Sequence, residues 1–179
     1  KNKEFEEALK LVEFAYNSGI DAVIVQDLGL AKKIMELFPK LEVHSSTQMT
    51  IYNLDGVKEI EKLGYSRCVL ARELSIEEIK NICKNTNIEI EVFIHGALCI
   101  CYSGQCLMSS LIGGRSGNRG KCAGTCRLPY SLLKDGQEKE KGYLLSSKDV
   151  CTLDILPELI EAGVKSFKIE GRMKSPQYV

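Results

Sequence analysis

Residues 17–25, NSGIDAVIV, form the end of a helical pattern, a glycine turn and a β-branched strand pattern. The same order recurs at residues 62–70, KLGYSRCVL, and at residues 161–169, EAGVKSFKI. Glycine at this position closes a helix in the left-handed conformation before the chain turns into a strand. A helix–glycine–strand unit that repeats along a chain predicts parallel strands covered by helices.

Six short β-branched runs alternate with helical patterns at near-constant spacing. This spacing favours a (β/α) barrel over a doubly wound sheet, although 179 residues are fewer than a complete barrel needs. We therefore expect a single α/β domain over residues 1–179, an incomplete TIM-barrel-like (β/α) fold, and interpret it as a fragment of a longer chain. The predicted strands cover residues 21–27, 41–46, 67–73, 90–96, 143–149 and 165–171.

Residues 97–141 interrupt the period with many glycines and little hydrophobic regularity. They predict an elaborated cysteine- and glycine-rich insertion loop on the face where barrels carry their chemistry. The chain has a formal net charge of zero and no apolar run of membrane-spanning length. We therefore expect no membrane partner, and expect nucleic-acid binding only through a local patch. Because no signal-peptide pattern is visible, we expect a cytoplasmic protein.

Polar side chains follow the predicted strands at their carboxyl ends, which meet at one mouth in a barrel. His44 and His95 both fall at this end, and Glu170 and Arg172 place opposite charges after the sixth strand. A lone histidine is more often hydrogen-bonded structure than a catalyst. Taken together, however, the four residues predict a catalytic set, with His44 or His95 as an acid–base group and Glu170 orienting Arg172 or substrate.

Other polar residues at strand ends have simpler interpretations. Candidate helix caps are Asp27, Ser46, Thr47 and Ser147. Glu73 is a candidate ion-pair partner of Arg72 or Lys80.

Eight cysteines in a chain without a secretory signal predict thiols or ligands more than a disulfide scaffold. Cys68 and Cys83 lie in apolar strand and helix patterns and are predicted to pack in the core. Four others lie within 28 residues, and the last three of them lie among glycines, hydroxyls and arginines. Flexible loops of this kind let thiolates converge on one point. These four are Cys99, Cys106, Cys122 and Cys126.

The run EVFIHGALCICYSGQCLMS, residues 91–109, resembles the signature of the U32 peptidase family, Glu-x-Phe-x-x-Gly-Ala-Leu/Met-Cys, then Ser-Gly-x-Cys and Ser. Flanking segments are also similar to this family: HSSTQ (44–48), GRSGNRGKCAGTCR (114–127), SSKD (146–149) and IEGRMKSPQYV (169–179). The family was named for collagenase-like proteolysis, whereas several bacterial relatives act in hydroxylation of RNA bases or ubiquinone precursors with iron–sulfur clusters. The resemblance thus implies either of two activities.

The resemblance also implies a [4Fe–4S] cluster, since family members ligate one through cysteines of this region. The spacing Cys-x6-Cys-x15-Cys-x3-Cys lacks the close pairs of zinc ribbons, but a cluster needs only four thiolates on flexible loops. By this resemblance, the residues that bind the cofactor and ligate its iron are Cys99, Cys106, Cys122 and Cys126. Cys151 is an alternative to the fourth.

Basic residues gather in the same loop, with no acidic residue between Gly113 and Leu133. Such a patch beside glycine amides suits RNA phosphates or an anionic small metabolite, and a solvated loop fits equally well. The basic residues are Arg115, Arg119, Lys121 and Arg127, and Tyr102 and Tyr130 are near enough to stack on a base. We select Arg115, Arg119, Arg127 and Tyr102 as the candidate substrate-binding residues.

By its resemblance to the family, we expect an iron–sulfur enzyme that takes part in hydroxylation of a tRNA or rRNA base, and favour this over a peptidase. The sequence contains no Gly-x-Ser-x-Gly elbow and no His-Glu-x-x-His motif. Cys99 could pair with His95, but four residues along a strand hold the two side chains too far apart for direct contact. The alternatives are a U32-type peptidase and a non-catalytic cluster-binding subunit that acts with a protein partner.

Overall fold

The computed structural model describes residues 2–171 and 174–179. Arg172, one of the predicted catalytic residues, therefore lies outside the described residues. The described helices include none that is both long and apolar enough to cross a membrane.

Six strands form the main sheet, with β4 (Glu89–Ala97) as its longest member. The strands β1 (Ala22–Val25), β2 (Glu42–Ser45) and β3 (Arg67–Val69) lead in parallel to one edge of β4. The strand β8 (Ser166–Glu170) pairs in parallel with β4, and β7 (Asp149–Cys151) pairs antiparallel with its carboxyl end. The predicted α/β class with a parallel sheet is confirmed.

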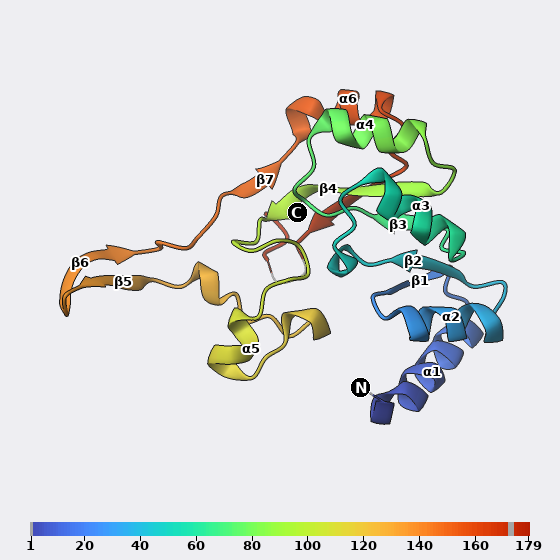
Figure 1. Cartoon of the computed structure of the whole chain (residues 1–179), viewed down its shortest axis with the longest axis horizontal. Helices are drawn as coiled ribbons and strands as arrows, with labels where there is room; N and C mark the ends of the chain where they lie inside the picture. Colours follow the sequence, from blue (N-terminus) through green and yellow to red (C-terminus); the bar gives the residue numbers. More distant parts are fainter. Residues whose placement is uncertain (1, 172–173) are drawn as a thin grey trace.

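Helices cover one face of this curled sheet (Figure 1). They are α1 (Asn2–Asn17), α2 (Leu28–Leu37), α3 (Leu54–Lys62), α4 (Ile76–Lys84) and α6 (Leu156–Glu161). Strand residues such as Val43, Cys68 and Ile90 pack against them and are almost fully buried, together with the helix residues Ile34 and Ile82. Burying these apolar side chains supplies the main driving force for the fold, at about 2 kcal/mol for each one.

Two of the four predicted helix caps, Asp27 and Ser46, are formed at the starts of described helices. The Asp27 carboxylate accepts from the Leu30 amide at the start of α2. The Ser46 hydroxyl accepts from the Gln48 amide at the start of the short helix η1 (Thr47–Met49). Both residues are thus structural, as the simpler interpretation held. The predicted partners of Glu73 are replaced by Ser103, whose backbone N–H and hydroxyl both donate to its carboxylate.

The strand predicted at residues 143–149 is wrong. Residues 143–148 have no strand conformation, and the strand that follows, β7, runs antiparallel to the others. The side chain of Tyr143 is 67% exposed, so this run lacks the buried face that a central strand requires. The chain reaches β4 instead from a hairpin, β5 (Tyr130–Lys134) with β6 (Gln137–Gly142), which projects away from the sheet (Figure 1).

The insertion at residues 97–141 contains short elements before this hairpin. They are α5 (Met108–Gly113), η2 (Gly117–Arg119) and η3 (Thr125–Arg127). After the hairpin and β7, a last short helix, η4 (Leu153–Ile155), leads into α6.

The sheet face opposite the helices carries charged residues in place of a second apolar layer. Glu91 is 5% exposed and accepts hydrogen bonds from Lys168 at 2.9 Å and Ser166 at 2.8 Å. Arg67 joins Glu91 to Glu89 through its two ends. Burial opposes ionisation of Glu91, but the bonds from Lys168 and Ser166 and the nearby positive charges outweigh it and lower its pKa. The carboxylate therefore links three strands.

Replacing Glu91 by alanine should destabilise the fold by about 3 kcal/mol, because Lys168 and Arg67 then lose their buried counter-charge. The folded-state pKa of Glu91 is lowered, so its contribution is present above its unfolded pKa of about 4 and is lost as pH falls through the folded value. Urea unfolding from about pH 6 to about pH 3 should show a steeper loss of stability in wild type than in Glu91→Gln.

Glu59→Gln is the control, because Glu59 forms an exposed pair with Lys62 on α3. It should change stability by less than about 1 kcal/mol. Equal acid sensitivity of wild type and Glu91→Gln would show that Glu91 does not couple to folding.

Candidate functional site

The cysteine-bearing loop, residues 98–107, docks onto the segment that follows β2. The Thr50 hydroxyl donates to the Ser103 carbonyl at 2.7 Å, and the side-chain amide of Gln105 donates to the Thr50 hydroxyl at 2.7 Å. The Gln48 side chain donates to the Gly117 carbonyl at 2.9 Å. These bonds hold two parts of the insertion against the carboxyl end of β2.

Gly104 lies at the closest approach between the loop and η1. Its φ is +76°, and a Cβ built there would come within 2.3 Å of the Gln48 carbonyl oxygen. Only glycine allows both this left-handed conformation and this backbone contact. The docking of the cysteine loop therefore depends on the absence of a side chain at residue 104.

Arg72 connects this loop to the sheet. Its backbone N–H donates to the hydroxyl of Ser103, which is itself 2% exposed. Its guanidinium lies over the Phe93 ring, with Cζ 3.9 Å from the ring centroid, and Nη2 donates to the Glu170 carboxylate. Nη1 points to the Cys99 sulfur at 3.5 Å. Arg72 thus joins an aromatic ring, a carboxylate and a thiol.

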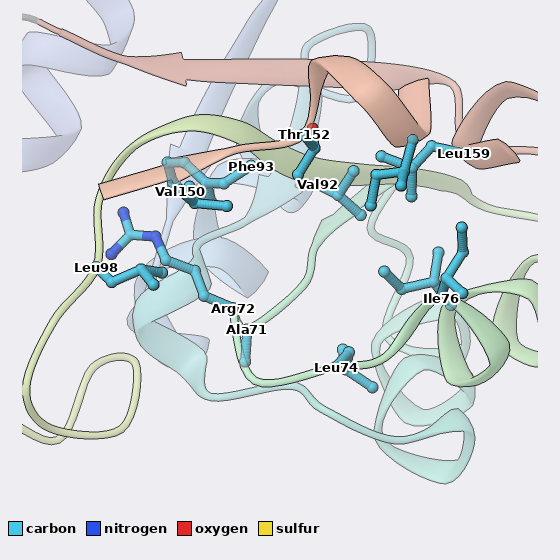
Figure 2. Close-up of a pocket in the computed structure, with 12 residues that line it drawn as sticks. Ala71, Arg72, Leu74, Ile76, Val92, Phe93, Leu98, Val150, Thr152 and Leu159 are labelled. Carbon is cyan, nitrogen blue, oxygen red and sulfur yellow. The ribbon is translucent and has the colours of Figure 1, made fainter. Parts of the chain in front are cut away.

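A small apolar pocket of about 110 Å³ lies beside Arg72, where β3 ends and β7 begins along β4. Figure 2 shows Arg72 extending from the segment after β3 toward Leu98 and Val150. The rest of the lining comes mainly from aliphatic residues such as Ile76 and Leu159. This low-polarity surrounding leaves the guanidinium dependent on its carboxylate, thiol and ring partners.

Three of the four predicted cysteine ligands interact electrostatically. Burial raises the pKa of the Cys99 thiol, the Arg72 charge opposes that rise, and the charges of Cys126 and Cys122 add to it. The backbone N–H of Gly124 donates to the Cys122 sulfur at 3.3 Å. A Cβ at Gly117 would lie 3.7 Å from the Cys122 Cβ and 4.0 Å from the Cys106 carbonyl oxygen. The insertion thus places Cys122 and the Cys106 backbone close to Gly117, and Cys122 and Cys126 near enough to Cys99 for their charges to act on it.

The sulfurs do not form a closed metal cage as they stand. Within residues 2–171 and 174–179, no group of three or more His, Cys, Asp or Glu side chains is arranged to hold a metal ion. The donor chemistry nevertheless fits an iron–sulfur cluster, because the thiols lie on loops and N–H groups of Arg72 and Gly124 point at two of the sulfurs. Cys151 is exposed on β7, where it lies opposite His95 in the pairing register.

The structural cysteines agree with the sequence interpretation. Cys68 is fully buried, and burial raises the pKa of its thiol to about 11. Cys83 is partly buried on α4, and burial raises its pKa as well. Neither thiol is positioned as a reactive group.

An open depression of about 360 Å³ lies beside Cys99. Its lining residues are Glu73, Cys99, Ile100, Cys101 and Tyr102. The Tyr102 side chain is 69% exposed, so one face of the ring is available to a ligand. A depression with a free aromatic ring next to a thiol can receive a planar group.

The two histidines do not meet. His44 is buried, its Nε2 lies 3.1 Å from a Glu42 oxygen, and in the sheet it lies opposite Arg67 at the start of β3. His95 lies near the end of β4, and its Nε2 is 3.1 Å from the Tyr178 carbonyl oxygen. Their rings therefore contact separate parts of the protein.

A register irregularity between Phe93 and His95 explains the direction of His95. Phe93 lies opposite Lys168, but His95 lies opposite Ile169 and Gly96 opposite Glu170. The shift turns His95 away from the face that carries Phe93 and Glu170. Gly96, with φ +139°, permits this path, because a Cβ there would lie 2.7 Å from the Glu170 Cβ.

The predicted basic patch divides into residues with different partners. Arg119 pairs with Glu4 of α1, and the Arg115 Nε donates to the Lys121 carbonyl at 3.0 Å. Arg127 donates to the Leu98 carbonyl at 2.7 Å, to the Ser147 carbonyl and to the Ser146 hydroxyl, and it pairs with Asp149. Arg127 therefore has a structural role that the sequence interpretation did not include.

Asp149 and Tyr178 form a further contact that the sequence analysis missed. The Tyr178 hydroxyl donates to the Asp149 carboxylate at 2.5 Å, which lowers the pKa of Asp149 and raises that of Tyr178. The Tyr178 ring also lies 4.6 Å from the His95 ring, between centroids. Tyr178 thereby contacts both β4 and β7. Asp149 and Tyr178 lie in two of the segments that resemble the family, residues 146–149 and 169–179. That resemblance was the feature of the sequence that could have pointed to them.

The sequence profile of Peptidase family U32 matches residues 1–179. This chain belongs to the U32 family. It is 48% identical over 98% of its length to the 23S rRNA 5-hydroxycytidine C2501 synthase of Escherichia coli, of which it covers 27%. It is 40% identical over 91% of its length to tRNA hydroxylation protein P1 of Bacillus subtilis, covering 40% of that protein.

A U32 relative with a proteolytic name is also similar. The collagenase of Porphyromonas gingivalis is 35% identical over 94% of this chain, which covers 44% of that relative. The solved structure of the U32 peptidase Mk0906 aligns with 54% of this chain at 17% identity and a TM-score of 0.44, and the chain covers 38% of that structure. The chain spans less than half the length of each of these three curated relatives.

Proposed function

We propose that this chain is the cluster-bearing part of a cytoplasmic iron–sulfur protein that takes part in hydroxylation of a base in tRNA or rRNA. The observation that carries the proposal is the 48% identity, over nearly the whole chain, to a protein named for 5-hydroxycytidine formation in rRNA. The docked cysteine loop beside an open depression supports the same proposal. The finer fold that we propose is part of a TIM-barrel-like (β/α) barrel.

A [4Fe–4S] cluster would be held by the insertion. The ligands that we propose are Cys99, Cys106, Cys122 and Cys126. Cys126 is preferred to Cys151 as the fourth ligand because it lies in the same insertion as the other three cysteines, whereas Cys151 lies on β7 opposite His95. When bound, such a cluster supplies one-electron transfer to the site.

The chain's own residues would bind and orient RNA next to this loop. Tyr102 offers an exposed ring for stacking a base, and Arg115 offers a charge for a phosphate. Arg119 could also contact a phosphate if its pair with Glu4 opened. Glu170 would hold Arg72 through their ion pair. The Nε2 atoms of His44 and His95 instead lie 3.1 Å from a Glu42 oxygen and from the Tyr178 carbonyl oxygen, respectively. An anionic small metabolite remains the second class of ligand.

Tyr102→Ala should reduce formation of the hydroxylated base about tenfold, since base stacking on an aromatic ring contributes about 1–3 kcal/mol. Tyr102→Phe should keep most of the activity because the ring is retained. The measurement is mass spectrometry of nucleosides from cells that carry each variant in place of wild type. Equal losses in both variants would contradict a stacking role.

A peptidase is the alternative, supported by the names of more distant relatives such as the collagenase. Its strongest candidate pair, Cys99 and His95, is not formed: Cys99 contacts Arg72 and His95 contacts Tyr178. A peptidase should cleave gelatin or casein without iron and lose that activity on thiol alkylation.

Anaerobic purification followed by iron and sulfide analysis tests the cluster. We expect about four irons per chain, lost in single serine variants of the four proposed ligands and retained in Cys151→Ser and Cys83→Ser. An iron-free protein with all thiols titratable would contradict the proposal. A non-catalytic subunit would instead carry the cluster and show turnover only when a partner is added.

A further inference from the structure

The Arg72 guanidinium lies 3.5 Å from the Cys99 sulfur, and the function proposed above gives it no role of its own. The side chain is only 11% exposed. A guanidinium in such surroundings acts more strongly on nearby charges than one in solvent, because water screens it less. Its effect on a neighbouring sulfur should therefore be large.

The position of this guanidinium is fixed on several sides. The Phe93 ring supports it at 3.9 Å, and the Glu170 carboxylate accepts from Nη2. The Arg72 backbone N–H donates to the Ser103 hydroxyl. The Ser103 backbone N–H in turn donates to the Glu73 carboxylate at 2.8 Å. An arginine that is 11% exposed and held in this way presents little of its charge to a phosphate of RNA. Its remaining end, Nη1, points to Cys99 at 3.5 Å.

We propose that Arg72 is a positioning residue that sets the electrostatic environment of Cys99, and that Arg72 and Glu170 together set the reduction potential of the cluster. This inference rests on the proposed cluster. Uptake of one electron adds one negative charge to the cluster and its thiolates, so a nearby positive charge favours the reduced state. The carboxylate of Glu170, which partly neutralises Arg72, has the opposite effect.

Two conservative variants should therefore shift the potential in opposite directions. Arg72→Gln removes the positive charge and should lower the reduction potential. Glu170→Gln keeps a hydrogen-bond acceptor for Arg72 but removes the negative charge, and it should raise the potential. Arg72→Lys retains the charge without the planar fork and should fall between wild type and Arg72→Gln. A general loosening of the site cannot produce shifts of opposite sign.

The experiment is an anaerobic redox titration of the reconstituted protein with dithionite, followed by visible absorption, with iron and sulfide analysis of each variant. Lys139→Gln is the control, because it removes one positive charge from the exposed β5–β6 hairpin and should leave the potential unchanged. Thermal unfolding of each variant checks that the fold is retained.

The outcomes separate this inference from the function on which it rests. Wild type without iron overturns the cluster and the inference with it. A cluster in all variants with unchanged potentials, or with shifts of the same sign, overturns the role of Arg72 and Glu170 but leaves the cluster in place. If Arg72→Gln cannot retain iron, the sign in Glu170→Gln decides: a higher potential supports the inference, and an equal or lower one overturns it.

Discussion

Replacing Gly104 by alanine should detach the cysteine loop from η1 and reduce cluster content and base hydroxylation at least tenfold. A Cβ at this residue would lie 2.3 Å from the Gln48 carbonyl oxygen, and the φ of +76° is unfavourable for any other L residue. The contact is with backbone, so it cannot be relieved by a change of rotamer. The bonds of Thr50 to Ser103 and of Gln105 to Thr50 would be lost as the loop moves.

Gly120→Ala is the matched control for this prediction. Gly120 has a similar φ of +70°, lies in the same insertion, and has no atom within 4 Å of the point that a Cβ would occupy. It should therefore show the conformational cost alone, about 1 kcal/mol. Iron content per chain, measured after anaerobic reconstitution, should fall in Gly104→Ala and remain near the wild-type value in Gly120→Ala. Equal iron content in the two variants would show that close docking at residue 104 is not required.

Replacing Arg127 by glutamine should destabilise the protein by about 3 kcal/mol and separate the insertion from β7. Its guanidinium donates to the Leu98 and Ser147 carbonyls and pairs with Asp149 at 3.2 Å. Glutamine is too short to replace these bonds, and partly buried carbonyl groups would be left without a donor. Chemical denaturation with urea measures the loss of stability directly.

Arg115→Gln is the comparison for Arg127. Arg115 is an exposed arginine of the same insertion with one bond, to the Lys121 carbonyl. Its replacement should change the free energy of unfolding by less than about 1 kcal/mol. A similar small change in both variants would contradict the structural role of Arg127 and return it to the substrate-binding candidates.

The parallel part of the sheet could be predicted from the sequence because local rules determine it. The glycines at residues 19, 64 and 163 all have positive φ and each precedes a strand, as the repeated helix–glycine–strand pattern indicated. These features depend on neighbouring residues in the chain, so a single sequence reveals them.

The antiparallel edge of the sheet and the irregular end of β4 could not be predicted in the same way. The antiparallel pairing of β7 with β4 depends on a hairpin returning the chain to a distant strand edge, which no local pattern encodes. The register shift that turns His95 away from Phe93 is also set by pairing with β8. A common location for His44 and His95 was predicted from their places at strand ends alone. In the structure His44 contacts Glu42 and His95 contacts Tyr178, so the two rings lie in different surroundings.

The candidate site was only partly visible in the sequence. Cysteine spacing identified the loop, but the role of Arg72 depends on Phe93, Cys99 and Glu170, which come from other segments. Its place at the end of the third predicted strand was the available signal. Arg127 was selected as a substrate-binding candidate because it lies in a basic loop. In the structure its guanidinium binds the Leu98 carbonyl and Asp149, which gives it a structural role.

The most direct measurement of the central claim is nucleoside mass spectrometry of tRNA and rRNA from cells in which the gene is deleted and then restored. We expect a hydroxylated base to disappear on deletion, to return with wild type, and not to return with Cys99→Ser or Cys122→Ser. Cys83→Ser, which alters a cysteine outside the proposed site, should restore it. Unchanged hydroxylated bases in the deletion strain would contradict the proposed function.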